Sequence, residues 1–235
     1  MIAHRNSIAA FIDFDGTLCD IYLWQALFSH HRQLRFKRVS LYAFVAFHMP
    51  LWLLYEARLL SRAFFYRMHA TNLAWLVSGV SVERADAIWE WMLENEIVPH
   101  LRPEMQAAIE DHQSQGHRVI LISGSFTPIL DTLATRLGFE RAIATPLAVK
   151  DGRYTGRIIP PLNIGRGKVE RLRQFLDGAG REIDLAASYF YTDSMVDAPV
   201  LDMFGYPVAV YPDPELASLA AARGWPVIGG NQTGS

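Results

Sequence analysis

The feature that most constrains the fold is a regular alternation of helix and strand patterns between Arg102 and Ile228. Short apolar runs typical of buried parallel strands are separated by segments with helical spacing, several of which end at a glycine. Strands are expected at residues 118–122, 142–145, 188–192, 207–210 and 225–228, helices at 106–115, 127–137, 168–176, 196–203 and 214–223, and an Asp-Gly hairpin at 149–154. This alternation predicts an α/β fold with a doubly wound parallel sheet.

An apolar run at residues 8–12 adds a first strand, and two aspartates follow it directly. Asp13 and Asp15 are two residues apart, so on a regular strand their side chains share a side, and Gly16 and Thr17 then form a turn. Two ionised carboxylates about 4 Å apart repel by roughly 4 kcal/mol at an effective dielectric near 20, unless a cation or a shared proton relieves them. The pair therefore indicates a metal site, with an exposed turn as the competing interpretation.

Length, charge and cysteine content limit the classes of protein to consider. The chain has 235 residues, 51% of them hydrophobic, which suits one domain with a substantial insertion or two small domains. A net charge of −2 argues against general nucleic-acid binding, which requires a basic face. Cys19 is the only cysteine, and we expect a small structural thiol there. Because the first strand begins too early for a signal peptide, a cytoplasmic location is expected.

Further polar residues stand where predicted strands end or helices begin. Ser123 and Gly124 follow one strand, where free backbone donors and the helix dipole favour an anion such as phosphate. Lys168 opens a helix and can reach a phosphate, with a solvated surface lysine as the alternative. Asp193 and Asp197 follow another strand, where helix capping is the alternative to metal binding. Ligands of open α/β sheets bind at the carboxyl ends of the strands, so these groups are expected to meet.

In this order, the polar segments resemble the motifs of the haloacid dehalogenase superfamily of phosphatases. The first to fourth motifs are matched by Asp13-Phe-Asp-Gly-Thr17, by Ser123, by Lys168, and by Asp193 with Asp197. The resemblance covers residues 8–18 and 101–228. Segments 116–126 and 150–157 are similar to the branch that contains the phosphoserine phosphatases, subfamily IB. The fold implied is a Rossmann-like core with an all-helical, C1-type cap inserted between the first two motifs.

The cap implied by the resemblance coincides with a change in the sequence. Residues 21–100 are rich in aromatic residues and carry helical rather than strand patterning. We therefore expect a discontinuous catalytic core formed by residues 1–20 and 101–235, and a helical cap formed by residues 21–100.

The resemblance also implies a reaction. Asp13 would attack phosphorus and form an aspartyl-phosphate, and Asp15 would protonate the leaving oxygen and then activate water. An acid at position 15 points to phosphate-ester hydrolysis, because the dehalogenases of the superfamily lack it. A catalytically silent binding or scaffold protein on the same fold is the rival hypothesis, but such a protein would normally have lost one of the motif residues.

The cofactor implied is Mg²⁺. It would be held by Asp13, by the backbone carbonyl of Asp15 and by Asp193, with Asp197 supporting it from close by, an all-oxygen set suited to a hard cation. The phosphoryl oxygens would be held by Ser123, the Gly124 amide and Lys168.

The substrate is less constrained than the reaction. Phosphoserine phosphatases hold the substrate amine with a glutamate nine residues after the nucleophile, and Tyr22 occupies that position here. This departure weakens phosphoserine as the substrate. A small soluble phosphomonoester and a lipid phosphomonoester of the phosphatidylglycerophosphate kind both stay open.

One segment of the cap favours the lipid class. Residues 41–55 are almost wholly apolar and aromatic, and His48 and Pro50 interrupt them, so a membrane span is not expected. Basic residues flank the segment, as in helices that lie on anionic lipid. Peripheral contact with an anionic membrane through residues 32–67, at its inner face, is therefore one expectation. Internal packing of the aromatic residues, or a homodimer, is the alternative.

Overall fold

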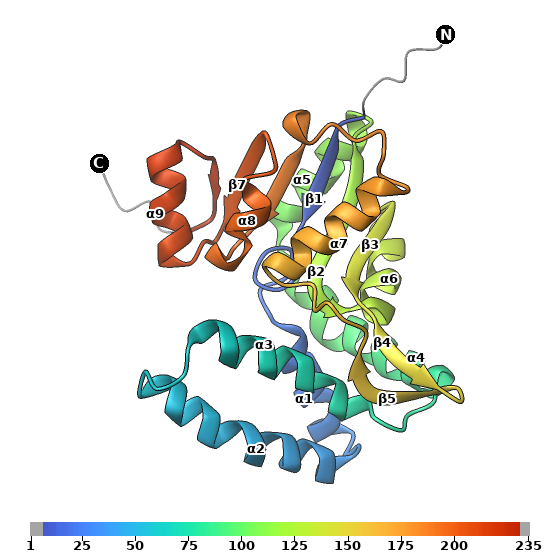
Figure 1. Ribbon diagram of the computed structural model, residues 1–235. Helices are drawn as coiled ribbons and strands as arrows, with labels where there is room; N and C mark the ends of the chain where they lie inside the picture. The colour runs from blue at the N-terminus through green and yellow to red at the C-terminus, as the bar shows by residue number, and fades with distance from the viewer. Residues whose placement is uncertain (1–6, 231–235) are drawn as a thin grey trace.

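The computed structural model describes residues 7–230, apart from the side chains of residues 62 and 63 (Figure 1). Its centre is a six-stranded sheet in the order β3-β2-β1-β6-β7-β8, in which all pairings are parallel. The strands are β1 Ala9–Ile12, β2 Arg118–Phe126, β3 Arg141–Thr145, β6 Tyr189–Thr192, β7 Tyr206–Val210 and β8 Val227–Ile228. The predicted α/β fold is confirmed.

Helices cover both faces of this sheet, and alternate residues of β1 show how. Ala10 and Ile12 join a buried cluster with α5 and α6, whereas Ala9 and Phe11 join a second cluster with α7, α8 and α9. The helices are α5 Pro103–Ser114, α6 Thr127–Arg136, α7 Arg166–Asp177, α8 Ala198–Leu201 and α9 Pro214–Arg223. Every residue of β1 is buried, as expected for a parallel strand covered on both sides.

Several elements differ from their sequence-based bounds, and β2 continues to Phe126, beyond the expected end at residue 122. The helix expected at 196–203 is a 3₁₀ turn, Met195–Asp197, followed by the short α8, and it ends at Leu201. The hairpin expected at 149–154 is present as β4 Leu147–Lys150 and β5 Arg153–Ile158, but it forms a separate two-stranded sheet. Asp151 and Gly152 both have positive φ, at 49° and 69°, as the tight hairpin turn requires.

Helices fill the chain between β1 and α5. They are α1 Leu23–Gln33, α2 Arg38–Glu56, α3 Arg62–Asn72 and α4 Val82–Met92, with short turns η1 Leu73–Val77, η2 Leu93–Ile97 and η3 Val98–His100. In Figure 1, α2 and α3 lie side by side below the sheet, and α3 stands between α2 and the core. Residues of α1 and α4 belong to the same buried cluster as the sheet, so the division at residues 21 and 100 stays a prediction.

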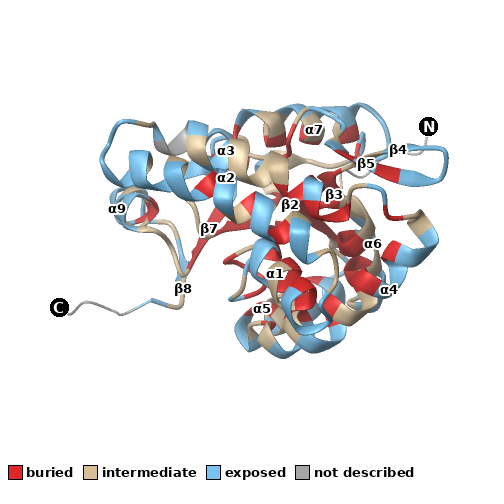
Figure 2. Cartoon of the chain, turned by 90° about the horizontal axis from the view of Figure 1, so that it is seen from below, coloured by how far each residue is buried: buried red, intermediate tan, exposed pale blue. Residues whose placement is uncertain are grey.

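The apolar cap segment lies within α2, which runs unbroken through Pro50. The proline ring removes one backbone donor but does not end the helix. By length and composition alone α2 could cross a membrane. It is nevertheless packed on α1, α3 and η1 through Leu41, Phe44 and His48. Figure 2 shows buried residues concentrated in the sheet and on α1, whereas α2 and α3 are largely intermediate or exposed.

Cys19 is buried, and its thiol donates to the carbonyl of Ile97 over 3.6 Å. Burial raises its pKa to about 12. A thiol so far from ionisation is a poor nucleophile, which agrees with the structural role expected for it.

Buried histidines make the helices between β1 and α5 sensitive to acid. Burial lowers the pKa of His30 and of His69 to about 4, against about 6.5 in an unfolded chain. Between these values the unfolded state binds more protons than the folded state, so stability is lost as the pH falls from about 6.5 towards 4. We predict that His69→Phe flattens the fall in denaturant midpoint between about pH 7 and pH 5. Identical pH slopes for the variant and the parent protein would refute this account.

Candidate active site

The site lies where the strand order reverses. From β1 the chain proceeds to β2 and β3 on one side and to β6, β7 and β8 on the other, and β1 pairs with β6. The Asp13 amide donates to the Tyr191 carbonyl over 3.0 Å, which places the carboxyl ends of β1 and β6 together. Asp13 and Asp193 leave these two ends. The reversal therefore brings together acidic residues that are distant in sequence, as expected for such sheets.

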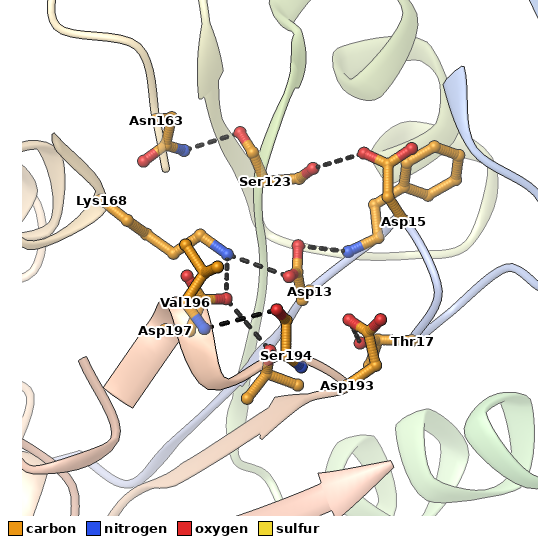
Figure 3. Close-up of polar contacts among 12 residues, drawn as sticks. Asp13, Asp15, Thr17, Ser123, Asn163, Lys168, Asp193, Ser194, Val196 and Asp197 are labelled. Atoms are coloured by element: carbon orange, nitrogen blue, oxygen red, sulfur yellow. Dashed lines mark hydrogen bonds and ion pairs between the residues drawn. The ribbon is translucent and has the colours of Figure 1, made fainter. Parts of the chain in front are cut away.

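Asp13 and Asp15 have different surroundings. The expectation that both side chains share one side of a strand fails, because β1 ends at Ile12. The Asp13 carboxylate accepts a hydrogen bond from Lys168 Nζ, whereas the Asp15 carboxylate accepts one from Ser123 Oγ (Figure 3). The repulsion inferred for the pair is therefore relieved by separate partners on different elements.

Three donors hold the Asp15 carboxylate. Ser125 Oγ and Ser123 Oγ donate to its Oδ2 over 2.6 and 3.2 Å, and the Leu23 amide donates to its Oδ1 over 2.7 Å. Burial nevertheless raises the pKa of Asp15, with these hydrogen bonds acting against the rise. A raised pKa suits a carboxyl group that must carry a proton near neutral pH. Because Leu23 begins α1, this acid is tied to the inserted helices.

Lys168 is a buried cation, only 2% exposed, and not the surface lysine that was the alternative. Its Nζ lies 3.0 Å from Asp13 Oδ2 and 2.5 Å from Asp197 Oδ2. Burial by itself would lower the pKa of Lys168, but the two carboxylates outweigh it and the pKa is raised. Thr192 Oγ1 donates to the same Asp197 oxygen over 3.0 Å. Asp197 therefore anchors Lys168, and its geometry favours that role over metal ligation.

Burial also raises the pKa of Asp13, with the charge of Lys168 acting in the opposite direction. At 3.0 Å the lysine favours the ionised carboxylate. The other oxygen, Oδ1, accepts from the Phe14 amide over 2.8 Å. The side chain is thus held in one orientation at the end of β1.

Asp193 has no such cation. Its Oδ1 accepts from Thr17 Oγ1 over 3.1 Å, and among the side chains that the structure describes no basic one forms a hydrogen bond or ion pair with it. Burial raises the pKa of Asp193 to about 7. Gly16 lies against it with φ +78°, and a Cβ there would stand 2.3 Å from Asp193 Oδ2. The turn after β1 therefore lies in close contact with the Asp193 carboxylate.

The donor set fits a magnesium ion in part. Asp13 and Asp193 offer carboxylate oxygens, and the Asp15 carbonyl belongs to the adjoining turn, which gives the oxygen ligands that Mg²⁺ prefers. No three histidine, cysteine, aspartate or glutamate side chains within the described residues converge as a metal cluster. Backbone carbonyl and water ligands would therefore have to complete the shell. The metal ligands stay a prediction. The Asp15 side chain is hydrogen-bonded to serine hydroxyls and the Leu23 amide, and the Asp197 side chain is paired with Lys168.

Ser123 and Gly124 do not follow the strand as expected but lie within β2, at an irregularity of its pairing with β3 between Ile122 and Phe126, and side chains from other segments hold their backbone. Asn163 Nδ2 donates to the carbonyls of Ser123 and Ile143 over 2.8 and 2.6 Å, and Thr145 Oγ1 donates to the Gly124 carbonyl over 2.8 Å. These bonds fix the backbone whose Gly124 amide and Ser123 hydroxyl are expected to receive an anion. Phosphate binding by Ser123 and Gly124 stays a prediction.

Sequence reasoning missed several of these residues. Ser125 lies two residues after Ser123, and that spacing was its only signal. Asn163 and Thr192 gave none, because an isolated asparagine or threonine is common in loops and strands. Their partners lie far away or on a neighbouring turn, and only the fold reveals them.

Tyr22 is the N-cap residue of α1, and its side chain lies near Asp193 and Asp15. A Cβ on Gly16 would lie 3.1 Å from its hydroxyl. Burial raises the pKa of Tyr22 to about 12, and the negative charges of Asp193 and Asp15 add to the rise. A neutral phenol therefore stands at the edge of the site.

Comparisons with known proteins agree with this geometry. A family model described as haloacid dehalogenase-like hydrolase matches residues 10–202. A histidinol-phosphatase of Neisseria meningitidis serogroup C (strain 8013) is 36% identical over 159 residues, which cover 67% of this chain and 71% of that protein. Two further curated relatives are longer proteins, and the chain spans 57% and 54% of their lengths.

Solved structures show the same architecture. A protein of unknown function from Bordetella pertussis Tohama I is similar with a TM-score of 0.80 and 28% identity, covering 95% of this chain and 99% of that one. A phosphoserine phosphatase solved as a phospho-aspartyl intermediate analogue has a TM-score of 0.61 at 20% identity, covering 95% and 93% of the two chains. The second likeness is one of fold alone.

The buried ion pairs predict an asymmetric response to mutation. Lys168→Met leaves two buried carboxylates without their cation, and we expect it to lower the free energy of unfolding by about 3–5 kcal/mol in the presence of a metal chelator. The double variant Lys168→Met/Asp197→Asn should recover part of that loss. Lys150→Met, at an exposed lysine, is the matched control and should stay within about 0.5 kcal/mol. Equal stability of the two single lysine variants in chemical denaturation would contradict the ion pairs.

Proposed function

The chain belongs to the haloacid dehalogenase-like hydrolase family, and on that basis we propose that it is a magnesium-dependent phosphomonoester hydrolase acting through an aspartyl-phosphate on Asp13. The observation that carries the proposal is the placement of Lys168. This buried cation joins the Asp13 carboxylate to Asp197, at the edge of the sheet where Asp15 is held by Ser123 and Ser125. A silent scaffold has no need for these charges in the protein interior, where burial is costly.

The first step is displacement at phosphorus. An Asp13 oxygen forms a bond to phosphorus while the ester P–O bond breaks, and Asp15 gives its proton to the leaving oxygen. Lys168 orients the Asp13 carboxylate and, with Ser123 and the Gly124 amide, offsets the charge on the phosphoryl oxygens.

The second step returns the enzyme to its starting state. Asp15, now ionised, takes a proton from a water molecule that attacks phosphorus and releases Asp13 and phosphate. Mg²⁺, when bound by Asp13, the Asp15 carbonyl and Asp193, would neutralise phosphate charge during both steps. Ser125 and the Leu23 amide keep the Asp15 carboxyl group in place throughout.

We propose a small soluble phosphomonoester as the substrate, of the kind that the Neisseria relative is named for. Tyr22 supports a substrate whose leaving group packs on a ring, because a neutral phenol cannot balance an ammonium ion as a glutamate can. Tyr66 of α3 is a second aromatic residue near Tyr22, since its phenol adds to the raised pKa of Tyr22. Histidinol phosphate and phosphoserine both carry an ammonium group, but only histidinol phosphate carries a ring, its imidazole, that can pack on these two aromatic residues.

The geometry gives little support to a lipid substrate. The apolar residues that suggested one lie on α2, which packs on α1, α3 and η1 and has α3 between it and the core (Figure 1). The exposed surface of α2 therefore does not line the catalytic carboxylates. A small substrate and a membrane-facing helix are compatible with each other.

Asp13→Asn tests the proposed nucleophile. We expect turnover of p-nitrophenyl phosphate to require Mg²⁺, to stop with chelator, and to fall at least about 10³-fold in this variant with the fold intact by circular dichroism. Asp20→Asn is the matched control, because Asp20 is an exposed carboxylate of the same segment, and it should keep parental activity. Undiminished turnover by Asp13→Asn would end the proposal.

Tyr22 tests the substrate class. The parental enzyme should hydrolyse histidinol phosphate with a kcat/KM at least about tenfold above that for phosphoserine. Tyr22→Glu should shift this ratio toward phosphoserine by about tenfold or more, whereas Tyr22→Phe should keep the preference. A parental preference for phosphoserine, or an unchanged ratio in Tyr22→Glu, would contradict the proposed specificity.

A further inference from the structure

The α2 helix carries a continuous apolar stripe on its exposed side. Its buried stripe, formed by Leu41, Phe44 and His48, faces α1 and α3. Residues on the opposite side are all exposed, and Val39 and Leu53 are 82% and 56% exposed. This α2 outer face consists of Val39, Tyr42, Ala43, Ala46, Met49, Pro50, Leu53 and Leu54. It contains no charged or strongly polar residue, and soluble proteins rarely expose such a contiguous surface without a partner.

The surrounding surface is strongly basic. Between residues 21 and 82 there is one acidic residue, Glu56, and there are seven basic ones, which makes this part +6 in a chain of net charge −2. Five of the basic residues are exposed arginines, and none of these five forms an ion pair with a described residue. They are Arg32, Arg35, Arg38, Arg58 and Arg67. Arg38 and Arg58 stand at the two ends of α2, beside the apolar stripe.

We propose that the α2 outer face docks on the surface of an anionic lipid bilayer. The apolar side chains would enter the boundary between head groups and acyl chains, and the flanking arginines would bind lipid phosphates. Tyr42 places an amphipathic ring at this boundary, where such rings are favoured. The docking is peripheral, because a helix that crossed the bilayer would lose the contacts that Leu41, Phe44 and His48 make with the rest of the protein.

The positive charge around the α2 outer face favours an anionic bilayer over a second copy of the chain. A second copy of the chain would bring the same +6 region to the interface, and the two sets of arginines would repel. A bilayer supplies an apolar layer beneath a sheet of negative charge, which complements both properties of the face at once. The proposal does not depend on the catalytic function, because the face lies on the far side of α3 from the core (Figure 1).

Vesicle co-sedimentation of the full chain tests the docking. We expect binding to vesicles of seven parts phosphatidylcholine and three parts phosphatidylglycerol, little binding to phosphatidylcholine alone, and weaker binding at about 0.5 M than at about 0.05 M salt. Arg38→Gln/Arg58→Gln should lower the partition coefficient roughly thirtyfold. Arg157→Gln/Arg173→Gln, two exposed arginines outside the region, is the matched control and should bind as the parent does.

A second pair of variants tests the apolar stripe. Met49→Glu/Leu53→Glu should abolish binding, whereas Val149→Glu, at a half-exposed valine of β4, should not. The far-ultraviolet circular dichroism spectrum of each variant reports whether it is folded. Absence of binding to either vesicle, or binding that neither double variant weakens, would overturn the proposal. So would a dimer in sedimentation equilibrium that Met49→Glu/Leu53→Glu converts to monomer, because the face would then belong to a second copy.

Discussion

The site depends on the contact of one buried ammonium group with two carboxylates. Lys168 Nζ lies within 3.0 Å of Asp13 and of Asp197, at the point where β1 and β6 end side by side. Buried ion pairs of this kind add little to net stability, because desolvation offsets their attraction, but they specify orientation. Lys168 therefore holds the Asp13 carboxylate in one place and favours its ionised form against the effect of burial, as the proposed nucleophilic role requires.

The neighbouring carboxylates take different roles because their partners differ. Asp15 is held by two hydroxyls and one amide, with a raised pKa that suits proton transfer. Asp193 has a hydroxyl donor and no cation, which is the environment that a metal ion would complete. In the proposed mechanism these four carboxylates serve as nucleophile, acid, metal ligand and anchor, and the differences in their surroundings support that division.

Much of this arrangement could be predicted from the sequence. Alternating apolar runs locate β6 and the start of β2 within a residue, since strand patterns are local, and the sheet then brings Asp13 and Asp193 to one edge. The side-chain partners could not be predicted. Ser125 and Asp15 are 110 residues apart, and Lys168 and Asp13 are 155 apart, so no local pattern records their contact. The exposure of α2 was equally hidden, because its apolar sequence suits a buried helix as well as a surface one.

Trapping the phosphorylated enzyme tests the central claim most directly. With p-nitrophenyl phosphate the leaving group needs little protonation, so Asp15→Asn should form the aspartyl-phosphate but hydrolyse it slowly. After an acid quench, mass spectrometry of tryptic peptides should find one phosphoryl group on the peptide that contains Asp13. Turnover with no such adduct, or a phosphoryl group on Ser123 or another residue, would contradict the assignment of Asp13 as the nucleophile.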